Sequence, residues 1–287
     1  MISVIGIGCG GSAIATQFAS EHNYDVYLLN NKIKENTERA HHLPHFATPE
    51  EYENQIPDLS TFLGDVRQRV QVFVIGSSMS SNYTLGILEQ IRDREIELFY
   101  IQPDTELLTG IAKTLEKITF GVLQQYARSG VFRSITLLSN LKLEEALGDV
   151  PIKAYYETLN QSIFSAVHYL NYFEFSEPEI GSVAKPSTVN RIRVIAALDI
   201  EKLEEKWFFG LDTPRELCYY ICINNDRLAK EGGLHRKLVE MLKEKPKNAY
   251  KKVSYAIYET DHHDFGFCVA HTNVVQEEKT LDELTQE

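Results

Sequence analysis

Cysteine is scarce in this chain, and basic residues are outnumbered by acidic ones. The 287 residues include four cysteines and no Cys-x-x-Cys pair, so neither a disulfide framework nor a structural zinc site is expected. There are 29 Lys+Arg against 41 Asp+Glu, which gives a formal net charge of −12 at pH 7. Because proteins that bind phosphate backbones need clustered cations, nucleic acid is not expected as the main ligand.

Long hydrophobic runs are missing as well. No apolar run reaches the roughly 18 residues that a membrane helix needs, and the apolar residues 2–7 lack the basic flank of a signal peptide. We therefore expect a cytoplasmic protein without a membrane segment. Hydrophobic residues make up 43% of the chain and charged residues 24%, which is typical of a globular protein.

The first half of the chain alternates strands with helices. Apolar, β-branched runs predict strands at residues 2–7, 24–29, 70–75, 96–101 and 134–138. Helical periodicity is found over residues 12–20, 85–91 and 107–126, the last with an expected buried face at Leu108, Ile111, Leu115 and Ile118. Residues 32–55 predict loops and at most a short helix. Strands that alternate with helices indicate a parallel sheet covered on both faces.

The second half of the chain has a different order of predicted helices and strands. Residues 154–173 predict the longest helix, with a buried stripe of Leu159, Ile163, Ala166, Val167 and Leu170. Strands are then expected at residues 191–198, 216–223, 253–258 and 265–271, with a helix at 234–242. We therefore predict an α/β fold in four parts: a nucleotide-binding domain (1–152), a central helix (153–173), a smaller α/β domain with a mixed sheet (174–275) and an acidic tail (276–287).

The first strand runs into a glycine-rich segment. Gly6, Gly8 and Gly11 have the G-x-G-x-x-G spacing of dinucleotide-binding loops, in which a strand, a turn and a helix present backbone N–H groups to phosphate. This pattern predicts a Rossmann-like, parallel-sheet domain. The acid that holds the ribose of NAD is missing, because Asn30 and Asn31 end the second strand. An NAD-binding enzyme is kept as the lesser alternative.

A second loop follows the third strand. It contains Gly76 and four serines, Ser77, Ser78, Ser80 and Ser81, and no lysine, so it is not a Walker A loop. Its hydroxyl and N–H groups suit phosphate binding at the start of the next helix. The alternative is that these small polar residues only form a tight turn and cap the helix.

Four segments together resemble the tubulin/FtsZ superfamily. Residues 2–12 resemble the opening strand and first glycine loop of FtsZ, with Cys9 in place of a usual glycine. Residues 76–82 occupy the place of the Gly-Gly-Gly-Thr-Gly-Thr-Gly signature loop. Residues 135–143 resemble the strand that ends in Pro-Asn, and residues 154–173 resemble the central helix. The chain is identified as a divergent member, similar to phage- and plasmid-type tubulins.

The resemblance implies a GTP-binding protein that assembles into cytoskeletal filaments, with GTP or GDP and Mg²⁺ held between successive subunits. It implies phosphate contacts from both loops and contacts to sugar and base from two asparagines. It also implies that two acids after the central helix serve GTP hydrolysis on the next subunit. The phosphate contacts would be Gly8, Cys9, Gly10, Gly11, Ser12, Gly76, Ser77, Ser78, Ser80 and Ser81; the asparagines Asn140 and Asn160; and the acids Glu174 and Glu177.

The sequence also departs from the family pattern. Serines replace most glycines of the signature loop, and Glu174 and Glu177 stand in a shortened loop where Asn-x-Asp-x-x-Asp is usual. These departures leave a second interpretation open, a tubulin-like protein without GTPase activity that acts as a binding or structural module.

Two remaining signals have plain interpretations. The histidines at 41, 42, 45, 262 and 263 lack the spacing of a zinc site, so no metal held by protein side chains is expected. The acidic tail is expected to be solvated, or to contact a protein adaptor or a neighbouring subunit.

Overall fold

The computed structural model describes residues 1–245 and 251–277. Most of the expected acidic tail, residues 278–287, lies outside the described residues. Its first expected residue, Gln276, is buried, and its backbone N–H donates to Gln124 Oε1 at 2.7 Å. The packed part of the chain therefore extends as far as Gln276.

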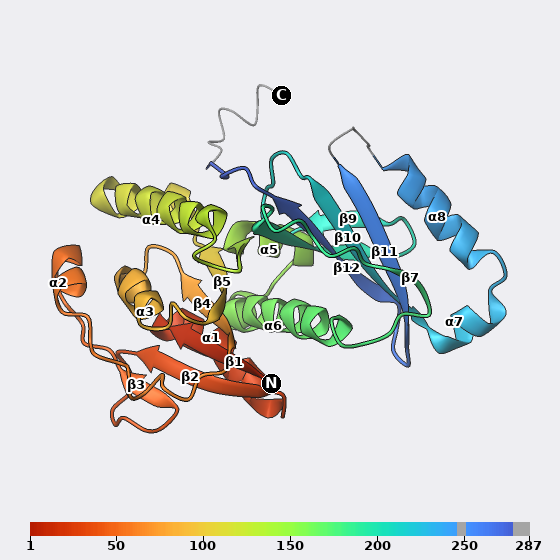
Figure 1. The fold of residues 1–287 in the computed structure, drawn as a ribbon. Coiled ribbons are helices and arrows are strands. Elements are labelled where there is room, and N and C mark those ends of the chain that lie inside the picture. Colours follow the sequence, from red (N-terminus) through yellow and green to blue (C-terminus); the bar gives the residue numbers. More distant parts are fainter. Residues whose placement is uncertain (246–250, 278–287) are drawn as a thin grey trace.

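The strands of the described residues join one 12-stranded sheet (Figure 1), in the order β3-β2-β1-β4-β5-β6-β8-β12-β10-β11-β7, with β9 paired to β8. The strands are β1 (Ile2–Ile7), β2 (Tyr24–Asn30), β3 (Ala40–His42), β4 (Arg69–Ile75), β5 (Glu95–Gln102), β6 (Ser134–Ser139), β7 (Ile180–Ser182), β8 (Ile192–Asp199), β9 (Glu204–Trp207), β10 (Glu216–Asn224), β11 (Lys252–Thr260) and β12 (Phe265–Thr272).

The sheet changes character along its width. Strands β1 to β6 pair in parallel, whereas the pairs β8–β12, β10–β12 and β7–β11 are antiparallel and β10–β11 is parallel. The expected α/β fold, with a parallel first part and a mixed second part, is confirmed. The two parts share one sheet, because β6 pairs with β8 through Ile135 and Ile192. The domain limits proposed above stay a prediction.

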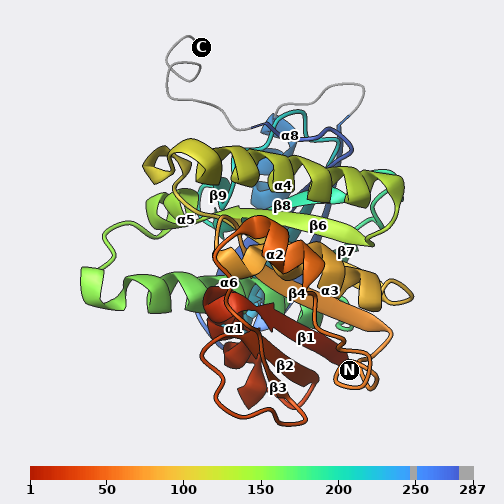
Figure 2. The ribbon, with the colours of Figure 1, turned by 90° about the vertical axis from the view of Figure 1, so that its left-hand side faces the viewer.

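Helices cover both faces of the parallel strands (Figure 2). The buried side chains place α2, α3 and α4 over one face and α1, α5 and α6 over the other, while α8 covers the second part of the sheet. Among the described residues, no helix has the length and apolar character needed to cross a membrane. The helices are α1 (Gly8–Gln17), α2 (Pro49–Asn54), α3 (Thr84–Gln90), α4 (Gly110–Ser129), α5 (Asn140–Leu147), α6 (Tyr155–Phe173), α7 (Asn225–Lys230) and α8 (Leu234–Glu244).

The long helix α6 joins the two parts of the molecule. Its buried residues Leu159, Ile163, Ala166 and Val167 share one hydrophobic cluster with Phe73 of the parallel strands and with Tyr258 of the mixed ones. Four of the five residues of the predicted stripe are thus buried, and the fifth, Leu170, is half-buried against the same cluster. A single rigid helix thus contributes to the core on both sides of the β6–β8 junction.

Two helix predictions were wrong in detail. Helix α1 begins at Gly8 rather than at Ser12, so the glycine segment is itself the first turn of the helix. Of the four residues predicted at helical spacing in α4, Ile111 and Ile118 are 77% and 55% accessible, Leu115 is half-buried, and Leu108 precedes the helix. Only the part of α4 from Glu116 onward has buried residues, among them Phe120 and Leu123. The apolar residues in the first turns of α4 therefore do not pack against the sheet.

Helix α1 lies unusually close to the strands beneath it. A Cβ atom on Gly11 would lie 2.3 Å from the Phe73 carbonyl oxygen of β4, and one on Gly6 would lie 2.5 Å from the Gly11 carbonyl oxygen. Glycine at these positions is thus required by the packing of α1 against β1 and β4.

We predict that Gly11→Ala destabilises the protein by about 1–3 kcal/mol, the usual cost of overpacking, although alanine favours a helix. The matched control is Gly121→Ala in α4, where an added Cβ meets nothing within 4 Å. The control should stabilise the protein by roughly 0.5–1 kcal/mol. Urea unfolding of both variants tests this, and equal midpoints would contradict the close packing.

Candidate functional site

Three of the parallel strands, β1, β4 and β6, end at the same edge of the sheet in segments that the sequence singled out. Gly8 follows β1, Gly76 follows β4, and Asn140 follows β6. The strand order reverses between β1 and β4, since the chain first builds β2 and β3 on one side of β1 and then returns to place β4 on the other. In open α/β sheets, ligands bind in the crevice at such a reversal, outside the carboxyl ends of the strands.

The glycine segment places backbone N–H groups at this edge. Gly8 has a φ of +76°, a conformation that glycine adopts without strain, and α1 begins there. The residue before it, Ile7, provides no side-chain cap for the helix. Cys9 and Gly10 are partly exposed. The uncapped N–H groups and the helix dipole together favour an anion at this position.

The side chain of Ser12 holds the segment together from inside. Its buried hydroxyl donates to the Gly6 carbonyl at 3.2 Å and accepts from Asn30 Nδ2 at 2.8 Å, and Asn30 Oδ1 accepts from the Lys32 N–H at 2.9 Å. Asn30 therefore anchors the loop at the position where NAD enzymes hold the ribose with an acid. A role for Ser12 toward a ligand is limited to its backbone, and remains a prediction.

The serine loop divides into two kinds of serine. The Ser78 hydroxyl donates to the Ile75 carbonyl at 2.9 Å, and the Ser81 hydroxyl donates to the Ser78 carbonyl at 2.6 Å. These two serines form the turn that leads into the 3₁₀ segment Met79–Tyr83 and into α3. Ser77, with a φ of +46°, and Ser80 have hydroxyls that make no hydrogen bond to any described residue.

The two loops are in contact with each other. A Cβ atom on Gly8 would lie 3.0 Å from Ser80 Cβ and 3.8 Å from Ser78 Oγ, while one on Gly10 would meet the side chain of Ile75. The fold thus brings together two segments that are more than sixty residues apart in the sequence. The side chain of Ser80 thus lies beside the first residue of α1.

An acid lies directly behind the serine loop. A Cβ atom on Gly76 would lie 2.6 Å from both carboxylate oxygens of Glu116 and 2.4 Å from the Tyr100 hydroxyl. The Tyr100 hydroxyl donates to Glu116 Oε1 at 2.7 Å. Burial and the neighbouring carboxylate raise the pKa of Tyr100 well above its ordinary value, so the phenol stays protonated. The sequence analysis missed this acid, because Glu116 lies within a helix whose buried face was misassigned.

The two predicted asparagines lie on the same side of the fold as the loops. Asn140 begins α5 immediately after β6, with Ser139 capping the helix. Asn160 is half-buried near the start of α6, whose apolar face shares a cluster with Ile14 and Ala15 of α1. The Tyr155 hydroxyl donates to Glu144 at 2.9 Å and links the two helices. Contacts of these asparagines to a ligand remain predictions.

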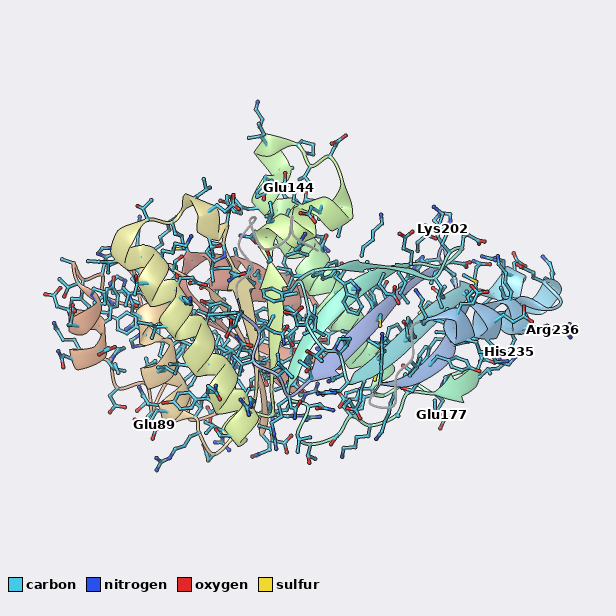
Figure 3. The ribbon with its side chains drawn as sticks, turned by 90° about the horizontal axis from the view of Figure 1, so that it is seen from above. Glu89, Glu144, Glu177, Lys202, His235 and Arg236 are labelled. Atoms are coloured by element: carbon cyan, nitrogen blue, oxygen red, sulfur yellow. The ribbon has the colours of Figure 1, made fainter. Side chains whose placement is uncertain are left out.

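The two predicted acids lie at the other end of the molecule. Figure 3 shows Glu177 and Glu89 along the lower edge of the view and Glu144, which lies in α5 after β6, at the upper edge. Glu177 is exposed and forms no ion pair with a described residue. Glu174 pairs with Arg69 and, at 3.2 Å, with Arg133 of its own chain. The two acids therefore differ in how available they are to another subunit.

A charged cluster that the sequence analysis missed surrounds Glu174. Glu97 of β5 is 1% exposed and accepts from Gln71 at 2.8 Å and from Arg69 at 3.0 Å. Arg133 Nε lies 3.3 Å from Glu97 Oε1, and Arg193 Nη2 lies 3.9 Å from Glu97 Oε2. Burial alone would raise the pKa of Glu97, but the arginines hold it below its ordinary value. Glu97 is a charged residue within an otherwise apolar strand, and this feature of the sequence could have indicated the cluster.

His271 of β12 lies beside this cluster. It is buried, and desolvation together with the charge of Arg193 lowers the pKa of His271 to about 3. The folded protein therefore keeps this imidazole neutral between pH 6.5 and 3, whereas the unfolded chain binds a proton there. Stability consequently falls as the pH falls through this window, by about 1.4 kcal/mol per unit for one proton.

We predict that His271→Gln makes the pH dependence of unfolding shallower by one proton between pH 6 and 4. The measurement is the free energy of unfolding in urea at several pH values. The same replacement at exposed His262 is the control and should leave the slope as in the wild type. An unchanged slope in His271→Gln would contradict a buried neutral imidazole.

Comparison with known proteins places this geometry in a structural context. No protein-family model matches the sequence, and no curated protein is similar enough in sequence to match it. Solved structures do match. GDP-form protofilaments of TubZ from Bacillus thuringiensis serovar israelensis have a TM-score of 0.71 at 12% identity, covering 96% of this chain and 88% of TubZ.

Two further solved structures match over most of the chain. FtsZ from M. jannaschii has a TM-score of 0.67 at 11% identity, covering 94% of this chain and 87% of FtsZ. CetZ from Methanosaeta thermophila strain DSM 6194 has a TM-score of 0.64 at 14% identity, covering 95% and 86%. The expected resemblance is thereby confirmed in three dimensions, and this chain has the fold of the tubulin/FtsZ superfamily in a highly divergent sequence.

Proposed function

We propose that this chain binds GTP in the crevice between the glycine and serine loops and assembles head to tail into filaments. The observation that carries the proposal is the contact between these loops at the strand reversal, with the uncapped start of α1 facing Ser80. Hydroxyl groups and helix N–H groups donate hydrogen bonds, and phosphate oxygens accept them. Mg²⁺ would arrive with the phosphates and neutralise part of their charge.

The position of the acids supports head-to-tail assembly. When parallel-sheet subunits stack end to end, the end of one subunit that carries Glu177 faces the loops of the next. An acid supplied across such an interface orients the attacking water only after the subunits have met. Because Glu174 is neutralised by Arg69 and Arg133, we assign the hydrolytic role to Glu177 first.

TubZ, with the same fold, has been described as a GTPγS-form protofilament, as GDP-form protofilaments and as two- and four-stranded filaments. We extend self-assembly from TubZ to this chain on the strength of the shared fold. An adaptor at the acidic tail belongs to the same proposal, although residues 278–287 lie outside the described part of the chain.

A second candidate is a tubulin-like module that has lost nucleotide turnover. Two observations favour it. The hydroxyls of Ser78 and Ser81 are used within their own loop. The carboxyl group of Glu116 lies behind Gly76, where negative charge opposes phosphate. Neither observation removes the donors at Ser77, Ser80 and the start of α1.

We predict that the protein sediments with GTP or a slowly hydrolysed GTP analogue in the presence of Mg²⁺, and that it releases phosphate only with GTP. Parallel samples with GDP, ATP, NAD and no nucleotide are the controls. Nucleotide binding without sedimentation or phosphate release would favour the second candidate. A thermal shift with NAD and with no other nucleotide would contradict the proposal and favour the NAD-binding enzyme.

We predict that Ser80→Asp weakens GTP binding at least tenfold, because it places a carboxylate beside Gly8 where phosphate is proposed to bind. Ser20→Asp is the matched control, since it adds the same charge at the exposed far end of the α1 segment. Calorimetric titration measures both affinities, and circular dichroism checks that both variants fold. Equal affinities would rule out the loop crevice as the nucleotide site.

We predict that Glu177→Ala slows phosphate release by at least tenfold while GTP affinity stays the same. Glu179→Ala removes an exposed acid from the same loop and is the control. Turnover should be measured above the concentration at which the protein sediments, because the acid acts on a neighbouring subunit. An unchanged rate in Glu177→Ala would remove this residue from the mechanism.

A further inference from the structure

A cavity of about 640 Å³ lies between the two parts of the molecule, at the end of the sheet opposite the nucleotide loops. Its walls come from the starts of β4, β5 and β6, from the last turns of α6 and from the mixed strands. The segment 183–190, which connects β7 to β8, forms another wall. A volume of this size suits a small organic molecule, since ligand cavities usually measure about 300–1,000 Å³.

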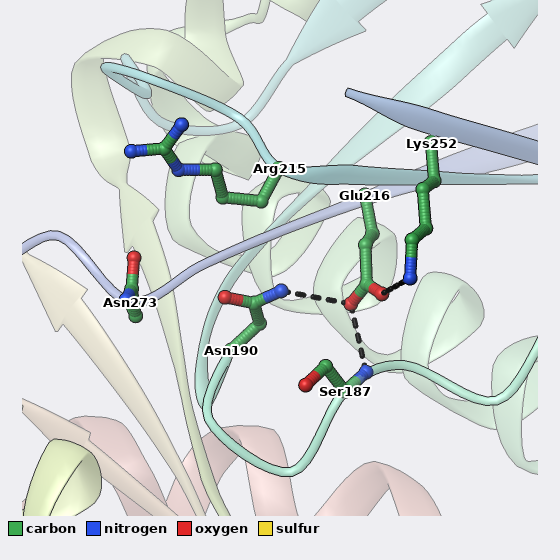
Figure 4. A pocket seen from close by; sticks show the side chains of 6 residues that line it. All are labelled: Ser187, Asn190, Arg215, Glu216, Lys252 and Asn273. Carbon is green, nitrogen blue, oxygen red and sulfur yellow. Dashed lines mark hydrogen bonds and ion pairs between the residues drawn. The ribbon is translucent and has the colours of Figure 1, made fainter. Parts of the chain in front are cut away.

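The connecting segment is held in place by buried Glu216 (Figure 4). Glu216 Oε2 accepts from the Ser187 N–H at 2.8 Å and from Asn190 Nδ2 at 3.0 Å, and Lys252 Nζ lies 4.0 Å from Glu216 Oε1. This wall of the cavity is therefore preformed rather than dependent on a ligand for its position.

The cavity is basic in a chain that is strongly acidic. Its lining contains five cationic side chains and two ionised acids, Glu97 and Glu174, whereas the whole chain has a net charge of −12. The cationic side chains are Arg69, Arg133, Lys185, Arg191 and Arg193. Concentrating cations in one cavity of an acidic protein costs electrostatic energy, and an anion bound there would offset it.

Arg193 has hydrogen-bonding capacity that the protein does not use. Its Nε donates to Thr136 Oγ1 at 2.5 Å, while its two Nη groups make no hydrogen bond to any described residue. The nearest acid, Glu97, lies 3.9 Å from Nη2 and is already shared with Arg69 and Arg133. Burial lowers the pKa of Arg193, with a further contribution from Arg69 and Arg133, and Glu97 and Glu174 oppose this effect.

Aromatic side chains form the remaining surface. The ring of Phe173 stacks on Tyr220 and Tyr258, with centroids 5.4 and 4.6 Å apart. The hydroxyls of Tyr220 and Tyr258 make no hydrogen bond to any described residue. Such walls accept a planar apolar group, and the planar guanidinium of Arg193 matches a carboxylate or phosphate oxygen pair.

We propose that this cavity binds a small organic anion, whose carboxylate or phosphate head pairs with Arg193 and whose ring packs beside Tyr220 and Tyr258. The site is independent of the proposed GTP site, because the two lie at opposite ends of the parallel strands. Its occupant contacts both α6 and the mixed strands and so bridges the two parts of the fold.

The test is calorimetric titration of the full chain with phenyl phosphate, benzoate and phenol. Saturable binding of one anion per chain, with phenol at least tenfold weaker, is the expected result. Phenyl phosphate and benzoate separate a phosphate head from a carboxylate head, and binding of either supports the proposal. Binding of neither anion, or equal binding of phenol, would overturn it.

Variants locate the site. Arg193→Gln should weaken anion binding at least tenfold, and the same change at exposed Arg236 on α8, labelled in Figure 3, should not. If Arg193→Gln does not fold, Lys185→Gln on the exposed connecting segment replaces it, with at least a threefold loss expected. Equal affinity in the cavity variant and in Arg236→Gln would overturn the proposal.

One further variant separates the two ends of the molecule. Ser80→Asp should leave anion affinity unchanged, because Ser80 lies at the nucleotide loops. Loss of anion binding in Ser80→Asp would mean that the probe binds at the loops instead, and would overturn the cavity proposal while leaving the proposed GTP site intact.

Discussion

The close packing of α1 against β1 and β4 is the constraint on which the rest of the site depends. With no side chains at Gly6 and Gly11, the helix backbone approaches the Phe73 carbonyl to a distance that excludes even a methyl group. This approach lets α1 start at Gly8, directly at the end of β1. The loop after β4 then meets the first turn of the helix, so a packing requirement of the core also brings the two loops together.

Parallel strands give the molecule two chemically different ends. At the carboxyl ends, glycine and serine segments expose N–H and hydroxyl donors with few side chains in the way. At the amino ends, arginines from β4, β8 and the segment before β6 gather around the buried carboxylate of Glu97. Two unlike ends are what a head-to-tail contact requires, and the proposed assembly rests on this difference.

The charges around Glu97 show how the two parts of the fold are joined. Arg69 also pairs with Glu174 at the end of α6 and contacts Asn171, while Arg193 belongs to β8 of the second part. Removing any member would leave a buried charge without its partner, which is costly in a low-dielectric interior. The cluster therefore ties α6 to both halves of the sheet and engages Glu174, whereas Glu177 and Glu179 of the following loop form no ion pair with a described residue.

Local sequence determined the elements. Strand runs such as residues 70–75 are β-branched and apolar because both faces of a parallel sheet are buried, and this pattern is visible without a structure. The stripe of α6 was predicted from a different pattern, the helical spacing of its apolar residues. The face of α4 was not predicted correctly, because periodicity reports an apolar stripe but not which part of the helix has a sheet beneath it.

The candidate site was predictable only in part. Glycine spacing indicated the first loop, and strand ends indicated the second. The tertiary structure was needed to show which serine hydroxyls form hydrogen bonds within their own turn and that Ser80 lies against Gly8. Both depend on backbone geometry, which composition does not encode. The sequence by itself determined the strands, the long helix and the two loops, because these follow from short-range patterns of side chains. Only the tertiary structure decided which loops meet, which acids are neutralised and where the arginines gather, because those outcomes depend on pairing between residues far apart in the chain.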